Sequence, residues 1–109
     1  FYLFDNLLTG TIPTEVGDLT RLVYFDCFVN DLSGTIPTEV GKLTRMNWFS
    51  IGENSLHGSI PSVISLWSDL ETLFLSANNL TGTIPEEFMS LSKLSELMLR
   101  AFAFFVLLR

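Results

Sequence analysis

The side chains that most often carry out catalysis are scarce in this chain of 109 residues. It has a single histidine, His57, and a single cysteine, Cys27. Together they cannot supply a metal site with any recognised ligand spacing. Cys27 shares its repeat position with apolar residues, so we expect it to pack in a core rather than act as a nucleophile. The chain also lacks a glycine-rich phosphate loop, and we therefore predict no catalytic residue, no metal and no cofactor.

The charge of the chain excludes two classes of partner. Its formal net charge is -6 at pH 7, which would repel both nucleic acid and an anionic membrane surface. No segment approaches the roughly 18 consecutive apolar residues of a membrane-spanning helix. We therefore expect no nucleic-acid partner, and attachment to a membrane only through a segment absent from this chain.

The strongest pattern is a tetrapeptide, Gly-x-Ile-Pro, which occurs four times at a constant spacing. The four copies are 10–13, 34–37, 58–61 and 82–85, so each begins twenty-four positions after the one before. A fixed period in this range indicates a stack of structural repeats, none of which can bury its apolar face alone. The elements that position any functional side chain must therefore repeat with the same period.

Alignment of the copies assigns an element to each part of the repeat. Alternation such as Phe25-x-Cys27 predicts a short strand with one buried face, paired in parallel with its equivalent in the next repeat. An asparagine follows each strand, where its amide can bond unpaired backbone groups of neighbouring turns. These asparagines are Asn6, Asn30, Asn54 and Asn78.

The proline of the tetrapeptide suits the first turn of a short helix, where no amide donor is needed. We expect Gly17 and Gly41 to close this helix in the first two copies. Ser65 and Met89 replace these glycines, so the later helical segments are expected to run differently. Trp67 stands where the other copies have leucine, and we interpret it as a bulky core residue.

The complete unit reads L-x-x-L-x-x-L-x-L-x-x-N-x-L-x-G-x-I-P-x-x-V-G-x. It resembles the leucine-rich repeat family, specifically the plant-type class that has this same period. The resemblance implies an α/β fold: a right-handed horseshoe segment with a parallel concave β-sheet and short 3-10 or helical convex segments. We expect about four and a half uncapped repeats over residues 1–101 and an irregular apolar tail over 102–109.

Aromatic and acidic residues recur at the strand positions that point away from the core. Aromatic side chains are the usual anchors of recognition sites. The alternative is that strand propensity alone favours aromatics there. The predicted ligand-binding residues of the concave face are Tyr2, Phe4, Tyr24, Asp26, Phe28, Trp48, Ser50, Glu53, Glu71 and Phe74.

The resemblance extends to the ectodomains of receptor-like kinases and receptor-like proteins and to polygalacturonase inhibitors. It implies a non-enzymatic recognition module for a protein, peptide or glycan, at the cell surface or outside the cell. Asn79-Leu80-Thr81 is an N-glycosylation sequon that agrees with this location.

Other interpretations of the sequence remain open. A cytoplasmic interaction scaffold is the main alternative. A minor one is an ice-binding solenoid that uses stacked hydroxyls such as Thr9-Gly10-Thr11 on its flank. The uncapped ends would also favour self-association.

Overall fold

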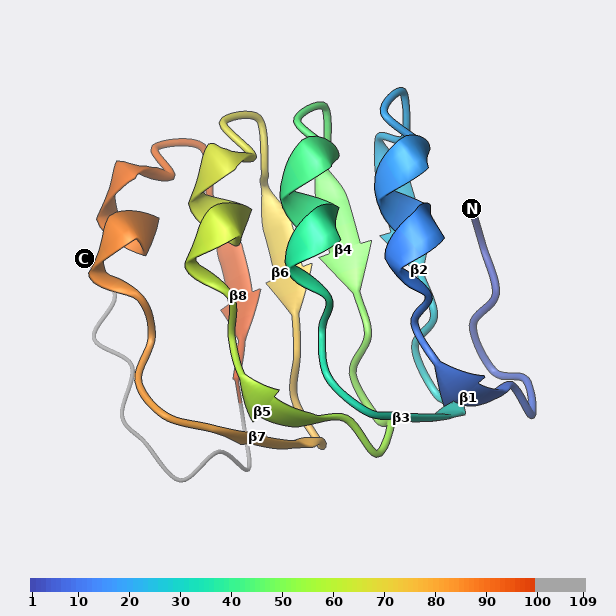
Figure 1. Ribbon diagram of the computed structural model, residues 1–109. Helices are drawn as coiled ribbons and strands as arrows, with labels where there is room; N and C mark the ends of the chain where they lie inside the picture. The colour runs from blue at the N-terminus through green and yellow to red at the C-terminus, as the bar shows by residue number, and fades with distance from the viewer. Residues whose placement is uncertain (100–109) are drawn as a thin grey trace.

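The computed structural model describes residues 1–99. The predicted apolar tail at 102–109 and the last two predicted repeat residues, 100 and 101, lie outside the described residues. Each turn of the solenoid contributes one strand to a main sheet, one short edge strand and one 3-10 helix (Figure 1). The fold inferred from the repeat is confirmed.

The main sheet is parallel, with strand order β2-β4-β6-β8. Its strands are β2 (Tyr24–Asp26), β4 (Trp48–Ser50), β6 (Thr72–Phe74) and β8 (Glu96–Met98). The register pairs equivalent residues of successive repeats, for example Tyr24 with Trp48 and Trp48 with Thr72. Tyr2 extends the sheet through an isolated parallel bridge to Asp26. The expected pairing of equivalent segments is therefore confirmed.

Four short strands lie along one edge of the solenoid, where they form two parallel pairs, β1 with β3 and β5 with β7 (Figure 1). They are β1 (Thr9–Thr11), β3 (Asp31–Ser33), β5 (His57–Ser59) and β7 (Asn79–Thr81). The motif glycines Gly10, Gly34, Gly58 and Gly82 have φ between 79° and 85°, a region that side chains with a Cβ rarely adopt. This conformation explains why each tetrapeptide begins with glycine.

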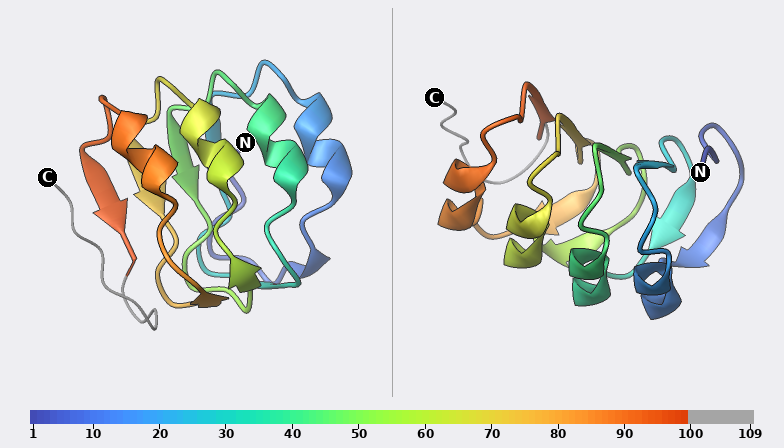
Figure 2. Two further views of the ribbon diagram at one scale, coloured as in Figure 1. Left: turned by 60° about the vertical axis from the view of Figure 1, so that its left-hand side comes forward. Right: turned by 90° about the horizontal axis from the view of Figure 1, so that it is seen from above.

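The 3-10 helices form a row on the side opposite the main sheet (Figure 2). They are η1 (Thr14–Asp18), η2 (Thr38–Lys42), η3 (Ser62–Leu66) and η4 (Glu86–Ser90). Each proline of the tetrapeptide stands at the N-cap rather than in the first turn. Its carbonyl accepts a hydrogen bond from the amide three residues on, as Pro13 does from Val16 at 3.1 Å.

The expected role of Gly17 and Gly41 was wrong. Both lie inside their 3-10 helices and are buried, rather than closing them. A Cβ on Gly17 would stand 2.6 Å from the carbonyl oxygen of Glu39, and one on Gly41 would stand 2.7 Å from Cβ of Val63. Glycine is therefore required by the close approach of neighbouring helices. The later helices, which lack it, have the same length of 5 residues.

The core lies between the main sheet and the 3-10 helices. One aromatic stack runs through it, with ring centroids 5.1 Å apart for Phe1 and Phe25 and 5.1 Å apart for Phe25 and Phe49. The ring of Trp67 continues the stack at 4.9 Å from Phe49. Trp67 is fully buried, and its indole N–H donates to the carbonyl of Val40 at 3.0 Å, which confirms the interpretation of Trp67 as a core residue.

The asparagine after each strand bonds its own turn to the turn before it. The Oδ1 atom of Asn54 accepts from the amide of Leu32 at 2.9 Å. Its Nδ2 atom donates to the carbonyls of Cys27 and Ile51, both at 3.0 Å, and to that of Gly52 at 3.1 Å. Asn30 and Asn78 repeat this pattern of one acceptor bond and donor bonds into both turns. Asn6 bonds only Leu3 and Phe4 of its own turn.

The first turn leaves the core open at the N-terminal end. A hollow of about 420 Å³ lies there, and apolar side chains such as Phe1, Leu3, Ile12 and Leu19 line it. Leu19 is 46% exposed, whereas its equivalent Leu43 in the next turn is fully buried. The difference follows because Leu43 has a repeat on both sides. Within residues 1–99, no helix has the length and apolar character needed to cross a membrane.

Candidate binding site

We call the solvent side of the main sheet the sheet face. It comprises Val23, Tyr24, Asp26, Phe28 and Val29, together with their equivalents in the other repeats of the described chain. Parallel pairing in register places equivalent side chains in columns about 4.8 Å apart. The predicted ligand-binding residues therefore come from successive turns that share one surface.

Four aromatic side chains form a continuous row on this surface, which we call the aromatic run. Ring centroids lie 4.7 Å apart for Tyr2 and Tyr24, 5.0 Å apart for Tyr24 and Trp48, and 5.4 Å apart for Trp48 and Phe74. The middle pair is stacked and the last pair is T-shaped, which are the favoured arrangements of aromatic rings. Tyr2 is 64% exposed, and the other three are half-buried. The sequence placed these residues on one face but did not show that their rings touch.

One predicted site residue does not reach the surface. Ser50 is 1% exposed, so the expectation that it lies on the open face is wrong. Thr72, at a neighbouring position on the next strand, is also buried, at 4%. The register makes Trp48 and Phe74 the diagonal of a square whose other corners are these two small residues. The large rings meet across that diagonal and cover the hydroxyls.

Phe4 and Phe28 lie beside the aromatic run. Phe4 is 54% exposed, while Phe28 is half-buried because its ring lies over the next turn. A Cβ on Gly52 would come within 3.2 Å of the Phe28 ring. Gly52 thus leaves the space that the Phe28 ring occupies.

The three predicted acidic site residues are accessible. Glu53 and Glu71 are exposed. Asp26 is half-buried, and its Oδ1 atom accepts a hydrogen bond from the amide of Phe28 at 3.1 Å, which fixes its position between Tyr2 and Ser50 in the sheet.

Two polar groups belong to the aromatic run: the phenol of Tyr24 and the indole nitrogen of Trp48. Burial raises the pKa of Tyr24, and the neighbouring Tyr2 and Asp26 raise it further, so the phenol stays neutral at physiological pH. The indole nitrogen of Trp48 is buried and has no hydrogen-bond partner among the described residues. The run is therefore an uncharged apolar surface bordered by carboxylates.

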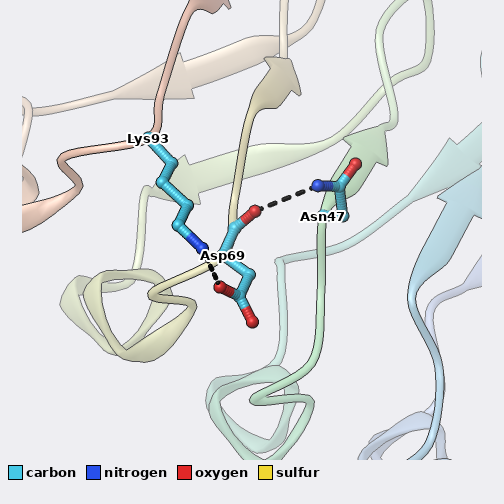
Figure 3. Close-up of polar contacts among 3 residues, drawn as sticks. All are labelled: Asn47, Asp69 and Lys93. Atoms are coloured by element: carbon cyan, nitrogen blue, oxygen red, sulfur yellow. Dashed lines mark hydrogen bonds and ion pairs between the residues drawn. The ribbon is translucent and has the colours of Figure 1, made fainter.

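A polar cluster at the edge of the sheet face was not found by sequence reasoning. Lys93 Nζ lies 2.6 Å from Asp69 Oδ1, and Asn47 Nδ2 donates to the Asp69 carbonyl at 3.1 Å (Figure 3). These residues line a hollow of about 290 Å³ together with Val23, Arg45 and Glu71. The signal was present in the sequence, because Asp69 is the acidic member of a column that otherwise holds Arg21, Arg45 and Lys93. Both partners of the ion pair are more than half exposed, so the pair contributes little to stability.

The remaining sequence candidates lie away from the sheet face. Asn79 is exposed in β7. The edge strands pair Thr11 with Ser33 and Ser59 with Thr81, whereas Thr9 pairs with Asp31 and His57 pairs with Asn79. The hydroxyl pairs lie in two separate two-stranded sheets, β1-β3 and β5-β7, rather than in one continuous array. In the part of the chain that the structure describes, no three potential ligand residues gather into a metal site.

Comparisons with known proteins agree with this architecture. The family model described as Leucine Rich Repeat matches residues 69–91. Comparison with curated protein sequences gave no significant match. Many solved structures match, and three of them show what kind of protein the chain is similar to.

A plant peptide hormone receptor, RGFR1 in complex with RGF2, is 36% identical with a TM-score of 0.92, and the match covers 94% of this chain and 16% of that one. The complex PEPR1-AtPEP1 is 40% identical with a TM-score of 0.88, over 91% of this chain and 14% of that one. The BIR2 ectodomain from Arabidopsis thaliana is 34% identical with a TM-score of 0.86, over 90% of this chain and 52% of that one.

The chain thus spans about half or less of the length of these proteins. What they share with it is the fold of this chain, as the TM-scores show. Modules of this kind are non-enzymatic. The chain is built of leucine-rich repeats, and these repeats resemble those of plant receptor ectodomains.

Proposed function

We propose that this chain is a recognition module that binds an extended segment of a peptide or protein on its sheet face. The observation that carries the proposal is the aromatic run of Tyr2, Tyr24, Trp48 and Phe74, whose rings touch in sequence across four turns. Nothing in the repeat requires aromatic residues at these positions. Large aromatic side chains at the centre of a surface are typical anchors of binding energy.

The size of the run suits a short extended segment. Four strands about 4.8 Å apart span roughly 14 Å from the first to the last. An extended chain covers about 3.3–3.6 Å per residue, so about four ligand residues would cross the run. Such a ligand would cross the strands of the main sheet rather than pair with them, because the inner strands are already bonded on both sides within the sheet.

The relatives support a peptide or protein ligand and an extracellular location. RGFR1 was solved with RGF2, and the ectodomain of GASSHO1/SCHENGEN3 from Arabidopsis thaliana was solved with CASPARIAN STRIP INTEGRITY FACTOR 2. We extend this location to the present chain, with Asn79 as an exposed glycosylation site. A glycan ligand and a cytoplasmic scaffold have no observation of this kind in their favour.

The proposal can be tested with a displayed library of linear peptides selected on the full chain. Selected peptides would then be measured by calorimetry against the chain and against Trp48→Ala. Loss of the central anchor is expected to weaken binding by about 2 kcal/mol, or roughly 30-fold.

Leu66→Ala provides the matched control. Leu66 is 56% exposed on η3, on the opposite side of the molecule. Circular dichroism must show that both variants keep the fold. Equal affinity of Trp48→Ala and the unaltered chain would place the binding surface elsewhere, and a library that yields no binder would argue against a peptide ligand.

A further inference from the structure

Over residues 1–99, the charged side chains of the sheet face are all acidic. Five of its positions hold carboxylates, and within residues 1–99 none of its positions holds lysine or arginine. The acidic residues are Asp5, Asp26, Glu53, Glu71 and Glu96. The whole chain has 12 acidic and 6 basic residues. If these charges were spread evenly over the surface, some of those on the sheet face would be basic.

The carboxylates border the aromatic run on both sides. Glu71 and Glu96 lie on the flank where the main strands begin, and Asp5 and Glu53 lie on the flank where they end. All four of these side chains are exposed. Glu96 is also the direct neighbour of Thr72 in the sheet, one strand beyond the Trp48 and Phe74 rings.

Two basic residues of the described chain lie at the edge of this surface. Arg45 and Lys93 lie in the polar hollow at its edge, beyond the first flank. The ammonium group of Lys93 is bonded to Asp69 (Figure 3). Of the carboxylates of the face, only Glu71 lines this hollow, whereas Asp5, Asp26, Glu53 and Glu96 do not.

We infer that the ligand of the sheet face is a cationic peptide whose lysine or arginine side chains lie over the aromatic run and between the flanking carboxylates. This inference rests on the proposed function and specifies the class of ligand. A basic side chain is attracted both by the faces of tyrosine and tryptophan rings and by carboxylates. An acidic peptide would meet like charge on both flanks.

Three synthetic peptides of equal length and equal aromatic content test the inference. They differ only at four positions, which hold lysine, glutamine or glutamate. Calorimetry at low salt should give an affinity for the lysine peptide about tenfold above that of the glutamine peptide, with the glutamate peptide weaker still. The preference should shrink several-fold at about 0.5 M salt, because exposed charges are then screened.

Charge-matched variants separate the face from the net charge. The triple variant Glu53→Gln, Glu71→Gln, Glu96→Gln should lose most of the preference for the lysine peptide. The control Glu15→Gln, Glu86→Gln, Glu87→Gln removes the same charge from η1 and η4, on the opposite side of the molecule, and it should keep the preference.

The outcomes distinguish this inference from the function on which it rests. Equal binding of lysine and glutamate peptides, lost in Trp48→Ala, would overturn the cationic ligand and leave the peptide-binding surface in place. Equal loss of preference in both triple variants would also overturn it. If neither these peptides nor any library peptide binds, the proposed function fails together with the inference.

Discussion

The asparagine that follows a strand bonds several backbone groups at once, and at Asn54 it bonds four. Asn54→Ala would remove one acceptor bond and three donor bonds. It would leave the part-buried amide of Leu32 without its partner, while the three carbonyls would keep only their other donors, which belong to Asn30, Asn78 and Val29. We expect a loss of about 2–4 kcal/mol in the free energy of unfolding, measured by urea denaturation.

Asn6→Ala is the matched control for this prediction. Asn6 is exposed and bonds only carbonyls of its own turn, so its removal should cost less than about 1 kcal/mol. Equal costs for the two variants would mean that the bonds between turns do not contribute as described.

Val29 has a backbone conformation that is unfavourable for valine. Its φ is 56°, in the left-handed region, as are the φ values of its equivalents Asp5, Glu53 and Ala77. A β-branched residue is strained there, whereas asparagine tolerates this conformation. Val29→Asn should therefore raise the free energy of unfolding by about 1 kcal/mol.

Val23→Asn serves as the comparison in the same urea titration. Val23 is also a valine of the sheet face, 41% exposed, but it is not among the described residues with positive φ. This variant should not be stabilised. A gain of the same size in both variants would show that the effect comes from surface polarity and not from backbone strain.

Cys27 makes the stability depend on pH. Burial raises the pKa of its thiol from 9.0 to about 11, and Asp26 adds to this, while the N-terminal ammonium group opposes it. The folded state therefore holds the thiol proton more tightly than the unfolded state. The resulting stabilisation is complete below pH 9 and is lost as pH rises towards 11.

Urea denaturation in reducing buffer from about pH 8 to pH 11 should show a decrease of about 1–3 kcal/mol. In Cys27→Ala the decrease should be smaller, with a remainder from Tyr24, whose pKa is also raised. Identical pH profiles would exclude the thiol as the source.

Neighbouring 3-10 helices approach so closely that there is no room for a Cβ at Gly41. Gly41→Ala places a Cβ 2.7 Å from Cβ of Val63, an atom that cannot move without its backbone. The crowding should cost about 1–3 kcal/mol, against a smaller gain from replacing glycine in a helix. Thermal unfolding followed by circular dichroism would measure it. Ser65→Ala, at the equivalent position of the next turn, should have little effect, and a similar loss there would contradict the packing argument.

The elements show what the sequence could and could not predict. The constant period of the tetrapeptide and the alternation around Phe25 predict the main strands and their register, because both depend on which side chains repeat. The role of Gly41 was missed, because a glycine that ends a helix and one that lets two helices approach look alike in sequence. The burial of Ser50 was missed for a related reason, since it results from contact between Trp48 and Phe74 on neighbouring strands.

The whole molecule exposes an apolar end, and this leads to a prediction about association. The hollow of about 420 Å³ beside Phe1 and Leu19 would be covered if a second copy stacked against it. If this end of one copy packs against a different surface of the next copy, each added copy leaves another such end open. The mass should then grow with concentration rather than stop at a dimer. Sedimentation velocity from micromolar to millimolar concentration would detect this growth.

Leu19→Lys should reduce this association, because it places a charge at the rim of the hollow. Leu66→Lys is the control, since Leu66 is similarly exposed but lies on η3, away from that end. A chain that stays monomeric throughout, or one whose association is reduced equally by both variants, would show that this end is not the contact.

The direction of the asparagine bonds has a consequence for how the chain is made. Asn30 bonds Leu3 and Leu8, Asn54 bonds Cys27 and Leu32, and Asn78 bonds Ile51 and Leu56. Every partner outside the residue's own turn precedes it in the sequence. Because a ribosome delivers the N-terminal residues first, each new turn finds its attachment points already synthesised. The molecule can therefore grow one turn at a time as it is translated, and each asparagine completes its bonds to the turn before it as soon as its own turn forms.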